Sequence, residues 1–249
     1  MNIFPAVLLS AVCAASLGHA GVVSIPALKD TTLYESGEAA VANGAGGYVF
    51  AGRTREQSEY LRRAVFEFDI QSAVPANAVI NSATLTLHMS NSRAESGTFA
   101  IHRLTREWTE GTTNVPGNGG GGAFPATGGD ATWLFATSPD VAWTGPGAAG
   151  DFIGAPSAST LVGGPAGFYS WTGMVDDVQL WLGNSAANHG WILMGEETVF
   201  GSAIRFESRN SPTEENRPVL IVDFTVVPEP AAPGMACAAL LALCGRRRR

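Results

Sequence analysis

Cysteine is nearly absent from this 249-residue chain, and its few copies lie near the two ends. Cys13, Cys237 and Cys244 are the only three, so residues 21–230 contain none. Disulfides are therefore excluded from this central part, which must be held together by its core alone. About 210 residues are enough for one sizeable core, and single all-β domains of this length are common.

Basic residues are scarce as well. The chain has 15 Lys+Arg against 22 Asp+Glu, and four of the basic residues are the terminal Arg246, Arg247, Arg248 and Arg249. The other 11 face all 22 acidic residues, so the central part carries about −11. The negative electrostatic field of this part opposes binding to nucleic acids and to anionic lipids. We therefore predict no nucleic-acid partner.

Histidine is rare, and its spacing offers no metal site. His19 lies near the N-terminus. The remaining histidines are His88, His102 and His189. None is spaced as His-x-x-x-His, so we predict no metal and no other cofactor. A structural calcium ion on Asp30, Asp151 or Asp223 is conceivable in a jelly roll, but the spacing gives it no support.

Motifs of catalysis are also missing. The chain has neither Gly-x-Ser-x-Gly nor a phosphate-binding loop, and we predict no enzymatic activity. Glu67 and Asp69 share one strand face, where we expect a solvated surface rather than a glycosidase pair. A polysaccharide lyase or hydrolase stays as the less favoured alternative. Its local candidates are Tyr34, Tyr48, Tyr60, Arg53, Arg55, Arg62 and Arg63.

The N-terminus has the features of an export signal. An apolar run over residues 3–17 is followed by Gly18-His19-Ala20, which has the small residues of a signal-peptide cleavage site. Met1-Asn2 departs from the usual pattern because it carries no Lys or Arg. We predict a signal peptide over residues 1–20, and therefore export.

The C-terminus, residues 227–249, combines a short motif with an apolar run. Pro228-Glu229-Pro230 precedes small apolar residues 231–245, and the terminal arginines follow. The arrangement resembles the PEP-CTERM sorting tail of bacterial surface proteins, which implies recognition by an exosortase-type enzyme and a transient association with the inner membrane. The apolar run falls short of the roughly 20 residues that span a bilayer comfortably. An ordinary tail-anchored membrane protein is the alternative.

Residues 21–226 alternate with the period of β-strands. In residues 62–70, Ala64, Phe66 and Phe68 share one face, and Val65 lies on the other. Residues 79–89 alternate in the same way, which is typical of an antiparallel sheet with one solvated side. Further strands are expected near residues 31–34, 47–51, 98–104, 190–195, 203–207 and 218–226. The sequence therefore predicts an all-β, jelly-roll-like antiparallel β-sandwich.

One short helix interrupts the pattern at about residues 173–182. Apolar residues recur there at helical spacing, including Val178 and Trp181. Thr172 is the expected N-cap, and Gly183 the expected C-cap. Between residues 111 and 167 the chain is rich in Gly and Pro, and we expect only short ordered pieces there.

A series of short motifs runs through the whole of residues 21–226. The series comprises Phe66-Glu67-Phe68-Asp69-Ile70, Ile80-Asn81-Ser82-Ala83-Thr84-Leu85-Thr86-Leu87, Trp108-Thr109-Glu110-Gly111, Ala131-Thr132-Trp133, Trp143-Thr144-Gly145-Pro146-Gly147 with Gly150-Asp151-Phe152, Asn188-His189-Gly190-Trp191-Ile192-Leu193, Phe206-Glu207-Ser208-Arg209 and Asn216-Arg217-Pro218-Val219-Leu220. In this order the motifs resemble the DNRLRE domain, a family of secreted modules related to carbohydrate-binding modules of alginate-degrading enzymes. The resemblance implies a β-sandwich that binds polysaccharide. The chain departs from the family in an insertion at residues 117–129 and in Asn210, where the family has an acidic residue.

Sugar binding calls for flat aromatic faces and, for acidic sugars, arginine forks. Trp181 and Trp191 are expected in the core. Trp133 and Trp143 lie in the Gly-rich region and are expected to face solvent. The predicted carbohydrate-binding residues are Arg53, Arg55, Arg63, Trp133 and Trp143. The alternative is that the arginines pair with Glu56, Glu59 and Glu67.

These features predict an exported protein of the cell surface or extracellular matrix that binds or organises extracellular polysaccharide without catalysis. The first alternative is a structural or adhesive matrix protein without a sugar site. The second is the lyase or hydrolase considered above.

Overall fold

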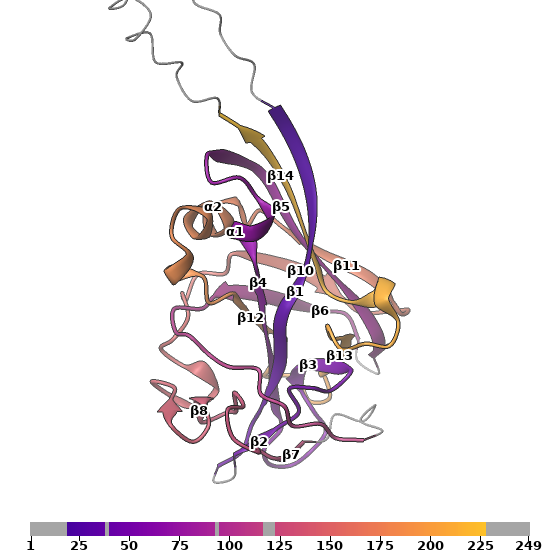
Figure 1. Ribbon diagram of the computed structural model, residues 1–249. Coiled ribbons are helices and arrows are strands. Elements are labelled where there is room, and N and C mark those ends of the chain that lie inside the picture. Colours follow the sequence, from indigo (N-terminus) through magenta and orange to yellow (C-terminus); the bar gives the residue numbers. More distant parts are fainter. Residues whose placement is uncertain (1–18, 38–39, 93–94, 117–122, 228–249) are drawn as a thin grey trace, which may run out of the picture.

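The computed structural model describes residues 19–37, 40–92, 95–116 and 123–227. The predicted sorting tail and residues 1–18 lie outside this part. The chain forms antiparallel strands that fold into two facing sheets, so the predicted β-sandwich is confirmed (Figure 1). The described ends of the chain, in β1 and β14, lie side by side at one end of the molecule (Figure 1).

We call the two layers sheet A and sheet B. Sheet A contains the first half of β1 (His19–Tyr34), β14 (Val219–Val226), β5 (Ala78–Ser92), β11 (Gly167–Thr172), β13 (Ile204–Glu207) and β3 (Tyr48–Arg53). Sheet B contains the second half of β1, β4 (Leu61–Phe68), β12 (Trp191–Met194), β6 (Gly97–Arg103) and β10 (Ala158–Val162).

Strand β1 joins the two sheets. From His19 to Pro26 it pairs with β14, and from Ala27 to Tyr34 it pairs with β4. A register shift between Ala27 and Lys29 marks the change of partner, as β-bulges commonly do where a strand bends. Cleavage after Ala20 would remove only the first two residues of β1.

The remaining elements are short. Two small ribbons pair β2 (Val41–Ala42) with β7 (Phe124–Pro125) and β8 (Phe135–Thr137) with β9 (Val141–Ala142). Single turns occur at α1 (Ile70–Ala73), η1 (Pro146–Ala148), η2 (Ser185–Ala187) and η3 (Glu214–Asn216).

The expected helix is α2 (Val175–Gly183), shifted slightly toward the C-terminus. Its caps differ from the prediction, because Met174 is the N-cap, with no side-chain hydrogen bond, and Asn184 is the C-cap. Asp176 and Asp177 lie in the first turn, where acidic residues favour a helix.

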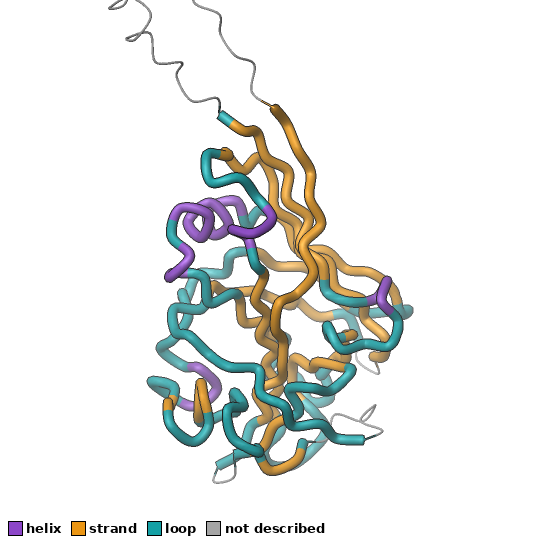
Figure 2. The backbone as a smooth tube through the Cα atoms, in the orientation of Figure 1, coloured by secondary structure: helices purple, strands orange, loops and turns teal. Residues whose placement is uncertain are grey.

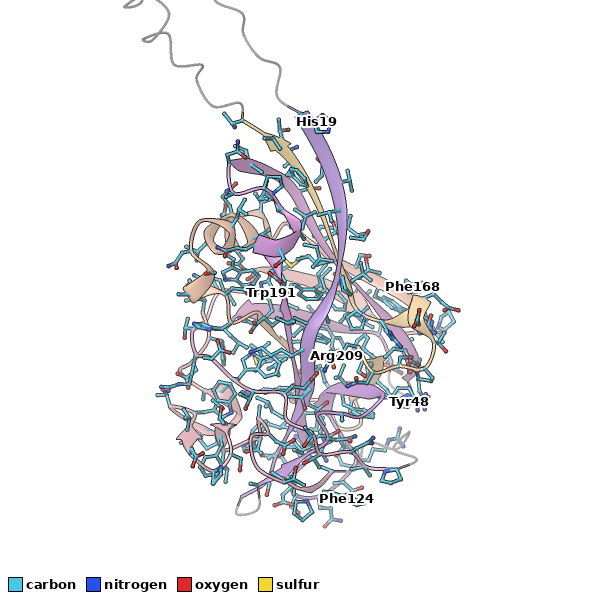
Figure 3. All side chains as sticks on the ribbon, viewed as in Figure 1. His19, Tyr48, Phe124, Phe168, Trp191 and Arg209 are labelled. Carbon is cyan, nitrogen blue, oxygen red and sulfur yellow. The ribbon has the colours of Figure 1, made fainter. Side chains whose placement is uncertain are left out.

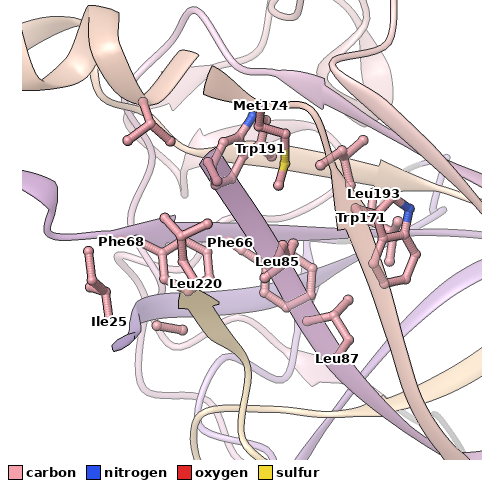
Figure 4. Packing of buried hydrophobic residues seen from close by; sticks show 14 of the residues in the cluster. Ile25, Phe66, Phe68, Leu85, Leu87, Trp171, Met174, Trp191, Leu193 and Leu220 are labelled. Carbon is pink, nitrogen blue, oxygen red and sulfur yellow. The ribbon is translucent and has the colours of Figure 1, made fainter. Parts of the chain in front are cut away.

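The main core fills the space between the sheets and beneath α2. The predicted inward residues Phe66, Phe68 and Leu85 are fully buried in it (Figure 4). Trp181 and Trp191 are also buried, with ring centroids 4.4 Å apart, as the sequence predicted.

A second core lies on the opposite side of sheet B, and the sequence did not predict it. Val65 was expected on a solvated face, but it is fully buried there together with Leu33 and Ile192. The cover consists of the Gly-rich segment between β6 and β10, which runs mostly as loops (Figure 2). Sheet A therefore has the open outer face, because sheet B is covered on both sides.

Candidate functional site

Trp133 and Trp143 were predicted to face solvent, and this prediction is wrong. They are 7% and 5% exposed and belong to the second core. The indole Nε1 of Trp143 donates to the carbonyl of Thr132 at 2.9 Å. A Cβ on Gly147 would lie 2.6 Å from the ring of Trp133, so only glycine lets the chain pack so closely on this ring. A flat tryptophan platform for sugars is therefore excluded at these two positions.

Arg63 of the predicted site also has a structural position. Its guanidinium makes two hydrogen bonds to Glu197, at 2.7 and 2.8 Å, and a third to the carbonyl of Gly147 at 2.6 Å. It also lies over the ring of Trp133, 5.1 Å from the centroid. Arg63 thus fixes the second core to β4, and the glutamates predicted to pair with it are not its partners.

Arg53 and Arg55, the other two predicted arginines, have different surroundings. The guanidinium of Arg53 stacks on the ring of Tyr60, with its carbon 4.1 Å from the centroid. Arg55 is exposed in the turn after β3. The five predicted residues therefore do not form one binding face.

A pocket lies beside Trp133. It encloses about 300 Å³. Its lining consists of Glu35, Ser36, Gly37, Glu59, Trp133, Leu134 and Pro146. These residues come from the end of β1, the β3–β4 turn and the second core. We call this cavity the Glu35–Glu59 pocket.

The outer face of sheet A carries a different arrangement, a line of ring and polar side chains across four strands. Phe168 on β11 lies directly opposite His88 on β5, with ring centroids 4.8 Å apart. Two residues along β5, the hydroxyl of Ser90 accepts a 2.9 Å hydrogen bond from Nε of Arg205 on β13. The guanidinium of Arg205 stacks on Tyr48 of β3, 4.1 Å from the ring centroid. We call these five residues the sheet A band.

The sheet A band is accessible and has a defined shape. Phe168 is 57% exposed, and the other four residues are half-buried. Phe168 and Tyr48 lie on the same side of the molecule (Figure 3). Four strands at about 4.8 Å spacing make the band roughly 15 Å long. Beside it, Thr86 and Ser170 face each other across β5 and β11, with hydroxyls 3.1 Å apart.

Alternation in the sequence could have located part of this band. His88 lies in the run of residues 79–89 whose alternation was predicted, but Phe168 lies in β11, which was not predicted. Arg205 and Tyr48 meet only because β13 pairs with β3, and this pairing has no local signal in the sequence.

A buried charge network lies where β1 enters sheet B. Lys29 contacts Glu67 at 2.9 Å, and Glu107 and the carbonyl of Trp108 at 2.7 Å each. Burial raises the pKa of Glu67, which is 8% exposed rather than on a solvated face as predicted. Burial also acts to raise the pKa of Glu107, but hydrogen bonds from Lys29 and His189 outweigh it and hold that pKa below its ordinary value.

Asp30 lies next to this network and is fully buried. Its Oδ2 accepts a 2.7 Å hydrogen bond from the backbone N–H of Arg209, whose guanidinium binds both carboxylate oxygens of Glu110. Burial, reinforced by the charge of Glu110, raises the pKa of Asp30 to about 8. The cluster joins β1, the second core and the β13–β14 connection, so its role is structural.

The carboxylates considered for calcium do not converge. Asp30 bonds to Arg209, Asp151 to Thr144 and Arg106, and Asp223 to Asn81. Within the described ranges, no group of three or more His, Cys, Asp or Glu side chains is arranged to hold a metal ion.

Each tyrosine considered for catalysis stacks with an arginine. Tyr34 is 1% exposed beneath Arg62, and burial raises the pKa of its hydroxyl. Tyr60 and Tyr48 are stacked with Arg53 and Arg205. Tyr34 therefore cannot reach a polymer chain as the base of a lyase.

Comparisons with known proteins do not identify a family for this chain. No protein-family model matches the chain, and no curated protein gives a significant match. Over the part of the chain that the structure describes, no helix has the length and apolar character needed to cross a membrane.

Proposed function

We propose that this protein is an exported, non-catalytic module of the cell surface or extracellular matrix that binds polysaccharide along the sheet A band. The observation that carries the proposal is the line of Phe168, His88, Ser90, Arg205 and Tyr48 across an open sheet face. Rings offer apolar faces to the C–H groups of sugars, and the guanidinium of Arg205 places one positive charge beside them. An open band of this length suits an extended polymer better than a small molecule.

The predicted route to the matrix supports the same function. The signal peptide would export the chain, and an exosortase-type enzyme would act at Pro228-Glu229-Pro230 after transient membrane association through the tail. Arg246, Arg247, Arg248 and Arg249 would hold the end of the tail on the cytoplasmic side until then. The position of the band now replaces the predicted Arg53, Arg55, Arg63, Trp133 and Trp143 as the proposed contact surface.

Affinity gel electrophoresis of the purified chain against a polysaccharide panel that includes alginate tests this proposal. We expect one polymer to retard the protein, and Phe168→Ala with Arg205→Ala to weaken binding about tenfold or more, as loss of central aromatic and arginine contacts does elsewhere. Phe124→Ala with Arg55→Ala is the matched control. Phe124 is 48% exposed and lies at the other end of the molecule from His19 (Figure 3).

Two outcomes would contradict the proposal. Equal loss of binding in the control pair would show that the band is not the contact surface. Shortening of the polymer during the assay would show catalysis.

A structural or adhesive role without a sugar site is the second candidate, favoured by one observation. Among the described strands, β14 alone pairs with residues 19–26 of β1, and Val22 there is 70% exposed. A long strand edge of this kind is a template for pairing with another chain. Unchanged mobility in every gel, together with self-association in sedimentation experiments, would favour this candidate.

A further inference from the structure

The Glu35–Glu59 pocket has a lining that differs from the sheet A band in charge and shape. Two of its side chains are carboxylates, and none of its seven lining residues is basic. Leu134, Pro146 and one edge of Trp133 supply apolar surface. Its volume of about 300 Å³ lies at the lower end of the range of about 300–1,000 Å³ for ligand pockets. One sugar ring fits such a space better than a chain does.

Both carboxylates are held in place through one oxygen each. Oε2 of Glu35 accepts a 2.9 Å hydrogen bond from the N–H of Leu61, and Oε1 of Glu59 accepts one of 3.2 Å from the N–H of Gly37. The backbone of Glu59 has a φ of 52°, a conformation that non-glycine residues adopt at a cost. No hydrogen bond in the described part of the chain uses the second oxygen of either carboxylate, so two acceptors remain for a ligand.

The hydrogen-bond donors of the nearby arginines bind other groups, although the charge of Arg62 also acts on Glu35 and Glu59. The guanidinium of Arg63 is bound to Glu197 and to the carbonyl of Gly147. That of Arg62 donates to the backbone carbonyls of Glu59 and Leu61 and lies over Tyr34. The two carboxylates outnumber this one guanidinium, so a uronate in the pocket would still meet net negative charge, which is unfavourable. An ammonium group would meet two charged acceptors.

We infer that this pocket binds one amino-sugar residue, with its ammonium group between Glu35 and Glu59 and the apolar face of its ring against Leu134 and Pro146, beside the small exposed part of Trp133. The inference rests on the proposed role in polysaccharide binding, and it names a second site with a different ligand.

Isothermal titration of the full chain with an oligomer of 2-amino-2-deoxyglucose tests this site. The N-acetylated oligomer, which keeps the ring but loses the charge, and an oligouronate are titrated in parallel. We expect the amino oligomer to bind at least tenfold more tightly than the N-acetylated one, and any heat from the oligouronate to be the same in Glu59→Gln as in the wild type. Glu59→Gln should weaken binding of the amino oligomer about tenfold, since Gln keeps the oxygen that accepts from Gly37 but removes the charge.

Attraction between an acidic protein and any polycation requires a control. Glu214→Gln removes the same charge from a side chain that is 82% exposed and forms no part of the pocket. We expect this variant to bind as the wild type does. Equal weakening by both substitutions, or equal affinity for the amino and N-acetylated oligomers, would overturn the inference.

The two sites are distinguishable in the same experiment. Loss of binding in Phe168→Ala but not in Glu59→Gln would overturn the pocket and leave the sheet A band in place. Loss in Glu59→Gln alone, with no polymer retarded in gels, would instead sustain the pocket and overturn the role of the band.

Discussion

Lys29, the only lysine in the chain, occupies a place that suits an ammonium group. Its Nζ contacts three oxygens in different directions, from Glu67, Glu107 and the carbonyl of Trp108, and it lies 4.7 Å from the centroid of the Trp108 ring. A compact charge with three rotatable donors satisfies such a set, whereas the flat fork of arginine is suited to two parallel acceptors. The single lysine is thus explained by geometry that composition alone does not reveal.

Asp30 gives a prediction at the scale of one residue. Its folded-state pKa of about 8 lies above the ordinary value of 3.8, so the folded protein binds this proton more tightly than the unfolded chain does. The stabilisation is fully present below about pH 4 and is lost as the pH rises to about 8. The free energy of unfolding should fall over this window by up to about 1.4 kcal/mol per pH unit.

Asp30→Asn should remove this pH dependence, because the amide oxygen still accepts from the N–H of Arg209 but does not titrate. Urea unfolding of both proteins at several pH values between 4 and 9 measures the difference. Asp140→Asn, at an exposed position, is the control for loss of one carboxylate. Parallel curves for the wild type and Asp30→Asn would show that Asp30 is not the titrating group.

At the scale of elements, Arg63 links β4 to Glu197 and to Gly147 beside the second core. Removing its side chain leaves Glu197 and the carbonyl of Gly147 without their partner in a partly covered site. Loss of one partner of a buried pair costs about 3–5 kcal/mol, and partial exposure lowers this value. We expect Arg63→Ala to lower the free energy of unfolding by about 2 kcal/mol.

Arg55→Ala is the matched control for this loss, because Arg55 is exposed and its removal should change stability by less than about 0.5 kcal/mol. Chemical unfolding of both variants gives the comparison. Arg63→Ala should still bind polysaccharide under conditions in which it is folded. Loss of binding by a folded Arg63→Ala variant would instead support the sugar site predicted from the sequence.

The alternating strands and α2 were predictable because each carries its own period. In β4, alternation correctly identified Phe66 and Phe68 as core residues. It also indicated that the other face of the strand is solvated, and this was wrong. Val65 is buried because a distant Gly-rich segment folds over it, and its three tryptophans, Trp108, Trp133 and Trp143, supply the apolar surface. Glycine richness suggested exposed loops, whereas here it permits close packing on a ring, as at Gly147.

At the scale of the whole molecule, the distribution of charge limits which polymers can bind and how. The central part carries about −11, yet the sheet A band presents Arg205 beside its rings. An acidic polysaccharide would therefore meet long-range repulsion from the molecule and local attraction at the band. These two effects act over different distances, so salt separates them. The Debye length shrinks from about 30 Å at 0.01 M salt to about 10 Å at 0.1 M, while contacts of a few ångströms are screened less.

Affinity for an acidic polymer should accordingly rise between about 0.01 and 0.1 M NaCl. A basic protein that binds a polyanion shows the opposite, because salt competes with the counterions released on binding. Affinity gels or titrations with sodium as the only cation measure this trend, and a neutral polymer serves as the salt-independent control. An affinity that falls steeply with salt would mean that several cationic groups contact the polymer, which the single arginine of the sheet A band cannot provide.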